Sequence, residues 1–278
     1  KFLRVFRGHL AAFLRHRYRV SDFPVHKADK AFIENLEAYF AQEKAFKLNT
    51  TAGYLTVLAS LLKDLYKRRV IDTYPFMGYS IRWDVGTPRY ITKDELRRII
   101  DLDDSQLGSY ELVSRDMFLF SCFTGLAIAD MERLKFSHIQ TSADGRRYIR
   151  KERQKTKVES VVPLHPIAEE ILSRCREEQT VKEKGDCLVF PCSCSRSTMN
   201  NKLSTVGKAC GIRQRLSFHM ARHTFGTLSL SAGIPIESIA KMMGHASISS
   251  TQIYAQVTDK KISEDMDKLI RKQQAASA

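Results

Sequence analysis

The chain has 278 residues, 43% hydrophobic and 27% charged, a composition typical of a soluble protein with two modest domains. No stretch approaches the roughly 20 apolar residues of a membrane span, so we expect no membrane partner. The basic start, residues 1–20, lacks a small-residue cleavage site and does not resemble a secretory signal. Lysine and arginine outnumber aspartate and glutamate by 45 to 31, which favours a polyanionic partner, although a merely basic surface gives the same count.

The first third of the chain is its most basic part. Residues 1–90 contain 16 basic and 8 acidic side chains. Apolar residues at three- and four-residue spacing predict helices over 29–45 and 49–70. The second helix ends in Lys67, Arg68 and Arg69, which suit a helix C-terminus and are expected to contact DNA. Residues 1–87 are therefore interpreted as a helical, core-type DNA-binding domain.

A break follows at residues 83–91, where Gly86 and Pro88 disfavour regular structure. We expect an interdomain linker there and a domain boundary near residue 88. A capping box, with Thr92 as the cap and Glu95 three residues later, predicts the start of the next helix.

Residues 88–278 are predicted to form a second domain, mainly helical with a short antiparallel sheet. Two strands are expected at 146–151 and 158–164, joined by a polar hairpin. Helices are expected at 109–123 (closed by Gly125), 127–135, 166–178, 197–209, 217–231, 235–244 and 248–256, with an amphipathic tail helix at 259–273.

The six cysteines do not indicate disulfides, because a chain of this size needs no such cross-links and a reducing cytoplasm is the simpler assumption. Cys187, Cys192 and Cys194 lie close together, but no second ligand pair follows at zinc-finger spacing. We expect no metal and a cytoplasmic location.

Four polar residues near the C-terminus have a spacing suited to phosphodiester chemistry. His219 and Arg222 lie three apart on one predicted helix face, His245 follows a glycine at a helix junction, and Tyr254 comes nine residues later. A tyrosine can attack phosphorus while arginine and histidine donate to the phosphate oxygens. Alternatives are half of a zinc site, weakened because HMARH lacks the glutamate of a metalloprotease helix, a helix-turn-helix over 232–254, and purely structural side chains.

As an ordered set these residues closely resemble the tyrosine recombinase (phage integrase-like) family. The pattern is H-x-x-R, then G-H, then Tyr, and the segment FTGLAIADMERLKFSHI at 123–139 looks like the first catalytic box of that family. The resemblance covers residues 92–257. It implies a recombinase fold with a helical core-binding domain and a mixed catalytic domain.

The resemblance also implies roles for individual residues. Tyr254 would be the nucleophile that forms a 3′-phosphotyrosine bond, and Arg222 and His245 would bind the scissile phosphate. His219 would assist proton movement, and Lys155 in the hairpin would protonate the leaving 5′ oxygen. Two further lysines of the hairpin, Lys151 and Lys157, are expected to contact DNA, although each is also an ordinary solvated side chain.

One position departs from the family pattern. Where the first box usually has arginine after T-G-L, this chain has Ala127. Arg153 lies two residues before Lys155, and on an extended strand both would project to one face, so Arg153 is expected to replace the missing arginine. Asp130 is expected to support the site. Some integrases of conjugative transposons resemble this chain in lacking that arginine, which suggests a mobile-element origin.

If the resemblance holds, four protomers assemble on double-stranded DNA attachment sites and exchange strands through a Holliday junction, without ATP, metal or other cofactor. It further implies a preceding arm-binding domain, accessory DNA-bending proteins and a nucleoid-associated bacterial protein. Two alternatives remain open at this point, a type IB topoisomerase-like enzyme and a recombinase-derived DNA-binding protein whose catalysis is weak or lost.

Overall fold

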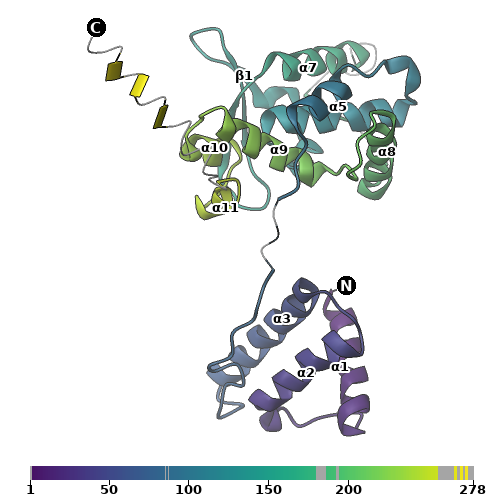
Figure 1. The fold of residues 1–278 in the computed structure, drawn as a ribbon, viewed down its shortest axis with the longest axis vertical. Coiled ribbons are helices and arrows are strands. Elements are labelled where there is room, and N and C mark those ends of the chain that lie inside the picture. The colour runs from purple at the N-terminus through teal and green to yellow at the C-terminus, as the bar shows by residue number, and fades with distance from the viewer. Residues whose placement is uncertain are drawn as a thin grey trace. The chain divides into compact units, whose positions relative to one another are not determined.

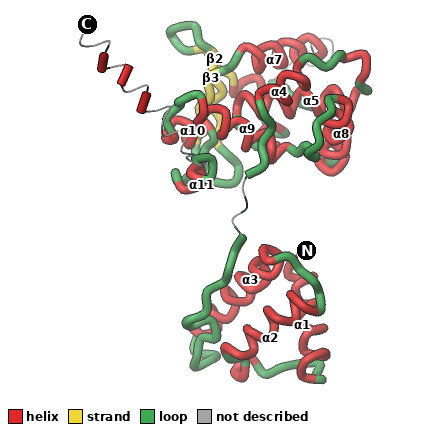
Figure 2. The backbone as a smooth tube through the Cα atoms, in the orientation of Figure 1, coloured by secondary structure: helices red, strands yellow, loops and turns green. Residues whose placement is uncertain are grey.

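The computed structural model describes residues 2–84, 86, 88–179, 186–191 and 194–255, together with six residues of the tail between 266 and 274. The chain divides into two compact units, Lys1–Gly86 and Thr87–Ala278 (Figure 1). The expected fold class, mainly helical with a small antiparallel sheet, is confirmed (Figure 2). No helix among these described residues is long and apolar enough to cross a bilayer. The predicted tail helix falls largely outside the described residues.

Three helices build the first unit: α1 (Phe2–Tyr18), α2 (Lys30–Gln42) and α3 (Leu48–Lys67). The helix α1 was not predicted, because arginines are scattered along its length. It nevertheless buries Phe6, Phe13 and Leu14, spaced by seven and one residues, on a single face. Their partners are aromatic and aliphatic side chains of α2 and α3, so the core of this unit is rich in stacked rings.

The segment that leaves the first unit is tied back onto it. The amide of Asn49 donates to the Asp84 carbonyl oxygen at 2.8 Å, and the Asp84 N–H donates to the Asn49 side-chain oxygen at 2.8 Å. The hydroxyl of Tyr79 donates to Glu37 at 2.5 Å. The chain is thus anchored as far as residue 84.

The second unit is organised around α5 (Ser109–Thr124), which contacts α4 (Lys93–Ile100), α7 (Pro166–Gln179), α8 (Arg196–Ala209) and α9 (Phe218–Ser231). The predicted capping box of α4 is confirmed, with Thr92 and Glu95 each accepting from the other's backbone N–H. The α5 helix ends as predicted at Gly125, whose φ of 68° is the left-handed conformation that glycine adopts without strain.

The sheet has the order β1–β2–β3 and is antiparallel throughout: β1 (Ile139–Thr141), β2 (Arg147–Glu152) and β3 (Glu159–Pro163). The short β1 was not predicted. Ile149 of β2 faces Val162 of β3, and both are buried, which fixes the register. The outer strand β3 packs against α10 (Ile236–Met242), as Figure 2 shows, and the Ser160 hydroxyl donates to the Met242 carbonyl oxygen.

Two predicted helices are shorter than expected. The helix predicted at 127–135 is only α6 (Ile128–Met131), because the following backbone pairs with another segment: Val189 N–H donates to the Leu134 carbonyl oxygen at 2.7 Å and Phe136 N–H to that of Cys187 at 3.2 Å. The helix predicted at 248–256 is only α11 (Ser249–Gln252). Beyond it the hydrogen bonds span three residues instead of four, which tightens the chain up to Tyr254.

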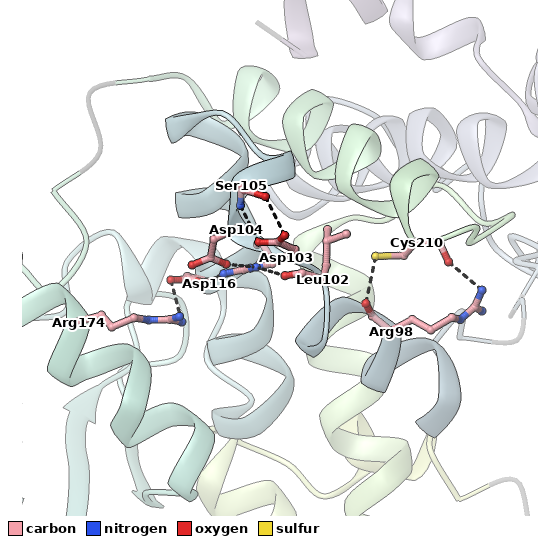
Figure 3. Close-up of polar contacts among 9 residues, drawn as sticks. Arg98, Leu102, Asp103, Asp104, Ser105, Asp116, Arg174 and Cys210 are labelled. Atoms are coloured by element: carbon pink, nitrogen blue, oxygen red, sulfur yellow. Dashed lines mark hydrogen bonds and ion pairs between the residues drawn. The ribbon is translucent and has the colours of Figure 1, made fainter.

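A buried ion-pair network fixes the loop between α4 and α5 (Figure 3). Arg115 is 3% exposed and donates to the Leu102 carbonyl oxygen at 2.9 Å, to Asp104 at 2.6 Å and to Asp116 at 3.2 Å. Asp116 also pairs with Arg174 of α7 at 3.1 Å. Burial raises the pKa of Asp116 although both guanidinium groups oppose the shift. The network joins the loop between α4 and α5 to α5 and α7.

Candidate active site

The predicted nucleophile, Tyr254, packs against α9. We call the surface of α9 formed by His219, His223 and Gly226 the seat of Tyr254. Its side chain is 8% exposed, and its Oη lies 3.2 Å from Nδ1 of His223. Below the ring, α9 presents Gly226: a Cβ there would lie 2.7 Å from two ring carbons of Tyr254. Burial raises the pKa of Tyr254, while the charges of Arg222 and Arg153 oppose that shift.

Two histidines of α9 form one edge of the seat. The rings of His219 and His223 meet edge-on, with centroids 4.2 Å apart. Desolvation, followed by the charges of its neighbours, lowers the pKa of His223 from 6.5 to about 4. The pKa of His219 is also lowered, by desolvation and by the nearby charges of Arg222 and Lys155. His223 is therefore a neutral imidazole at pH 7.

Arg222 is buried and joins three segments. It is 5% exposed and donates to the carbonyl oxygens of Gly125 and Met243, the second at 2.6 Å. These contacts connect α9 to the end of α5 and to the end of α10. Burial and the charge of Arg153 lower the pKa of Arg222 to about 10, so the guanidinium remains cationic at pH 7.

His245 follows the turn at Gly244, whose φ is +61°. Its Nδ1 lies 2.7 Å from the hydroxyl oxygen of Thr251, a fully buried residue of α11. Burial is the largest cause that lowers the pKa of His245 to about 4, and the charges of Arg222 and Arg153 add to it. The Thr251 contact orients the ring and links it to the segment that carries Tyr254.

Arg153 and Asp130 meet beside this turn, but not as the sequence predicted. The strand β2 ends at Glu152, so Arg153 and Lys155 do not project from one extended strand; Lys155 lies in the turn that follows. Arg153 bends instead over Gly244 and donates to its carbonyl oxygen at 3.4 Å. Its Nε lies 3.8 Å from Asp130 Oδ2, and Asp130 Oδ1 accepts from the Gln154 N–H at 3.0 Å.

The turn that carries Lys155 is attached to the same glycine. The hydroxyl of Thr156 donates to the Gly244 carbonyl oxygen at 2.8 Å. Lys155 itself is exposed, yet close enough to His219 for its charge to lower the pKa of that ring. Ala127, where the family has arginine, is half-buried at the start of α6 and offers no donor. The structure thus gathers Arg222, Arg153, His219, His223 and His245 around Tyr254, with Asp130 behind Arg153 and Lys155 at the rim.

The five basic residues expected to contact DNA differ in their surroundings. Lys67, Arg68 and Arg69 are exposed at the end of α3, where Arg68 pairs with Asp64 at 3.0 Å. Lys151 donates to the Arg133 carbonyl oxygen at 2.9 Å, and desolvation lowers its pKa. Lys157 pairs with Glu152 at 3.5 Å. The ion pairs of Arg68 and Lys157 are exposed and therefore weak, so they leave those two side chains available to phosphate.

Two parts of the seat, His223 and Gly226, were missed by the sequence reasoning. A glycine inside a strong helical pattern signals a close approach to the helix backbone, and this signal was present at Gly226. His223 was considered only as half of a zinc pair, and its contact with Tyr254 depends on a fold that no spacing reveals. Within the described part of the chain, no cluster of three or more metal-ligating side chains exists. The arrangement offers a hydroxyl nucleophile, a neutral acceptor, the buried guanidinium of Arg222 and the partly buried one of Arg153, which suits transfer of a phosphodiester.

Comparisons with known proteins agree with this chemistry. The sequence profile of the phage integrase family matches residues 89–261. The tyrosine recombinase XerC of Pelotomaculum thermopropionicum is 26% identical over 235 residues, which cover 80% of this chain and 74% of that protein.

Solved structures of low sequence identity share the fold. The Tn1549 transposon integrase, solved in complex with a circular intermediate DNA, matches with a TM-score of 0.68 at 16% identity, over 95% of this chain and 99% of that one. Lambda integrase bound to a COC′ core site matches with a TM-score of 0.66 at 19% identity, over 89% and 86% of the two chains.

Proposed function

The chain belongs to the phage integrase family, the tyrosine recombinases, and we propose that it recombines DNA by using Tyr254 to form a 3′-phosphotyrosine bond. As a member of this family it is a site-specific DNA recombinase. The observation that carries the assignment of the nucleophile is the seat of Tyr254. A buried hydroxyl lies 3.2 Å from a neutral histidine, on the helix that also holds the buried Arg222.

In the proposed reaction Tyr254 Oη attacks the scissile phosphorus while Arg222 and His245 donate to the non-bridging oxygens. Buried, preorganised donors stabilise the charge that develops in such a transition state better than water does. Arg222 is fixed by the two carbonyl oxygens that it contacts, and His245 by Thr251. His219 lies beside them and orients the phosphate.

Arg153 is proposed to supply the guanidinium that Ala127 lacks. It approaches from the β2–β3 turn. Its positive charge contributes to lowering the pKa of Arg222, so the two guanidinium groups lie close enough to interact. Among the described residues its buried Nε has no hydrogen-bond acceptor and faces Asp130 at 3.8 Å, so the guanidinium is only partly satisfied by the protein. Asp130 holds the side chain from behind.

A variant tests this replacement. Arg153→Ala is expected to reduce cleavage by roughly 10²–10³-fold while DNA affinity stays nearly unchanged. Lys208→Ala, at an exposed position of α8 in the same unit, is the matched control for loss of one positive charge. An Arg153→Ala protein that cleaves like the wild type would reject the role.

Lys155 is proposed as the acid that protonates the leaving 5′ oxygen. It is exposed at the rim, where a DNA strand can reach it, and its charge acts on His219. Lys155→Ala is expected to be defective on ordinary DNA and rescued by a substrate with a sulfur at the 5′ bridging position, because thiolate needs no proton to leave. Absence of rescue argues against this role.

The two units and the assembly are proposed on the family's pattern. Residues 1–87 form the core-type DNA-binding domain with Lys67, Arg68 and Arg69 near the phosphate backbone, and residues 88–278 form the catalytic domain with Lys151 and Lys157 at the DNA. Four protomers assemble on paired attachment sites, with accessory DNA-bending proteins. The likeness to the Tn1549 transposon integrase supports a transposon, proposed to be conjugative, as the source. A nucleoid-associated location in the bacterial cytoplasm is proposed with it.

The experiment for the proposed function uses a pool of nicked DNA duplexes with randomised internal sequence. Adducts that survive denaturation are recovered from the wild type and from Tyr254→Phe, and the enriched duplex is then tested for junction formation. Adducts from the wild type alone, followed by four-way junctions, support the proposal. Adducts without junctions indicate a topoisomerase-like enzyme, and binding without adducts indicates that catalysis has been lost.

A further inference from the structure

We propose that His223, rather than His219, accepts the proton of the Tyr254 hydroxyl during cleavage; this role rests on the proposed function of Tyr254 as the nucleophile. The geometry is direct. His223 Nδ1 lies 3.2 Å from Tyr254 Oη, within reach of a hydrogen bond, whereas His219 contacts the His223 ring, with centroids 4.2 Å apart. When the imidazole carries its proton on Nε2, the Tyr254 hydroxyl donates to Nδ1.

The surroundings of His223 keep it able to accept. Burial, followed by the charges of His219 and Arg222 on the same helix, lowers the pKa of His223 to about 4. The titratable groups near this pair from other elements are Tyr254 itself, Arg153, whose charge acts on Tyr254, and Lys155, whose charge acts on the adjacent His219. Burial raises the pKa of Tyr254, and the positive charges of Arg222 and Arg153 oppose that shift and so favour tyrosinate. A neutral acceptor within hydrogen-bond distance of the attacking hydroxyl meets the geometric condition for general-base catalysis.

The seat also fixes the direction of the hydroxyl. Gly226 lies three residues after His223, so both occupy one face of α9. The bare backbone at Gly226 admits the tyrosine ring, and His223 receives the hydroxyl at its tip. The His223 and Tyr254 rings meet with centroids 5.5 Å apart at 64°.

A lone pair of Tyr254 Oη forms the bond to phosphorus, and the hydroxyl proton passes to the Nδ1 lone pair of His223. The bond between phosphorus and the 5′ bridging oxygen breaks, and that oxygen takes a proton from the ammonium group of Lys155. In rejoining, the 5′ hydroxyl attacks the phosphotyrosine and returns its proton to Lys155, while His223 returns its own to Tyr254 Oη.

The test compares rates of adduct formation in a single turnover for the wild type and His223→Gln across a range of pH. The probe is the nicked duplex enriched from the randomised pool. Glutamine keeps a hydrogen-bond acceptor but has no useful basicity. His165→Gln, an exposed histidine of the same unit, is the matched control for loss of an imidazole. Circular dichroism and DNA affinity are measured for every variant, and His223→Ala is assayed with and without added imidazole.

We expect His223→Gln to be slower by roughly 10²–10⁴-fold near neutral pH. The rate of His223→Gln should rise about tenfold per pH unit, because Tyr254 must then ionise by itself. Its difference in rate from the wild type should therefore shrink at high pH, whereas the rates of the wild type and His165→Gln should change little with pH. Imidazole should restore part of the rate of His223→Ala. A His223→Gln protein as fast as the wild type, or slower by one constant factor at every pH, overturns the role. A wild type without any adduct overturns the proposed function, and this role with it.

Discussion

Replacing Gly226 by alanine tests how the position of the Tyr254 ring on α9 affects cleavage, separately from the stability of that helix. In the interior of an exposed helix this change stabilises the fold by about 1 kcal/mol. At Gly226 the added Cβ would lie 2.7 Å from Cδ2 and Cε2 and 2.9 Å from Cγ of Tyr254. Ordinary carbon contacts are about 3.5–4.0 Å, so the ring must retreat by about 0.8 Å. The Tyr254 hydroxyl then moves away from His223.

A misplacement of about 1 Å in a reacting group costs on the order of 10²-fold in rate. We therefore expect Gly226→Ala to cleave about 10²-fold more slowly in a single turnover, while its affinity for DNA is unchanged. Overpacking typically costs about 1–3 kcal/mol, which the gain in helix propensity partly offsets, so urea unfolding should show a net loss of about 0–2 kcal/mol.

Gly53 provides the matched control, because it also lies inside a helix, α3, and nothing lies within 4 Å of a Cβ added there. Gly53→Ala should gain about 1 kcal/mol and cleave normally. The reasoning is refuted if Gly226→Ala cleaves at the wild-type rate, since the tyrosine would then not depend on the seat.

Three further outcomes follow from the same structure. The pKa values of His223 and His245 fall from 6.5 to about 4 on folding, so the unfolded chain binds more protons between these values and stability is lost as pH falls through that window. Urea unfolding at pH 5 should show up to about 2 kcal/mol less stability per histidine than at pH 7, and a pH-independent difference would contradict the assignment. Arg222→Ala leaves two carbonyl oxygens unpaired and should lower the free energy of unfolding by about 2–4 kcal/mol as well as abolish cleavage; loss of cleavage at full stability would mean that those contacts contribute nothing. Thr224→Val removes the hydroxyl that accepts from the buried Ile91 N–H at 3.1 Å, and should cost about 1–3 kcal/mol without changing the pH profile of cleavage, as thermal unfolding would reveal.

Local signals in the sequence predicted much of the second unit. The capping box at Thr92, the glycine that closes α5 and the alternation in β2 and β3 each involve neighbours in the chain, and each prediction was confirmed. The predictions were wrong where hydrogen bonds to a distant segment of the chain determine the local structure. The helix after Ala127 was cut short because residues 134–136 pair with 187–189, and β1 exists only because β2 lies beside it. The helix α1 was hidden by arginines on its solvent face.

At the site, spacing identified residues that the fold does bring together, but not how they contact one another. The strand argument for Arg153 failed because β2 ends one residue earlier; the side chain reaches the site by bending over the left-handed turn at Gly244. Likewise, i and i+4 spacing made His223 a partner of His219, whereas its nearest polar partner is Tyr254, 31 residues later. Contacts between helices depend on packing, which no single-helix pattern encodes.

We propose above all that Tyr254 is the residue that becomes covalently joined to the DNA. The most direct measurement is mass spectrometry of the tryptic peptides from the covalent adduct, after nuclease digestion has reduced the DNA to a nucleotide. We expect a nucleotide attached through its 3′ phosphate to Tyr254, and none on the other nine tyrosines of the chain. A nucleotide on a different tyrosine, or one attached through a 5′ phosphate, would contradict it.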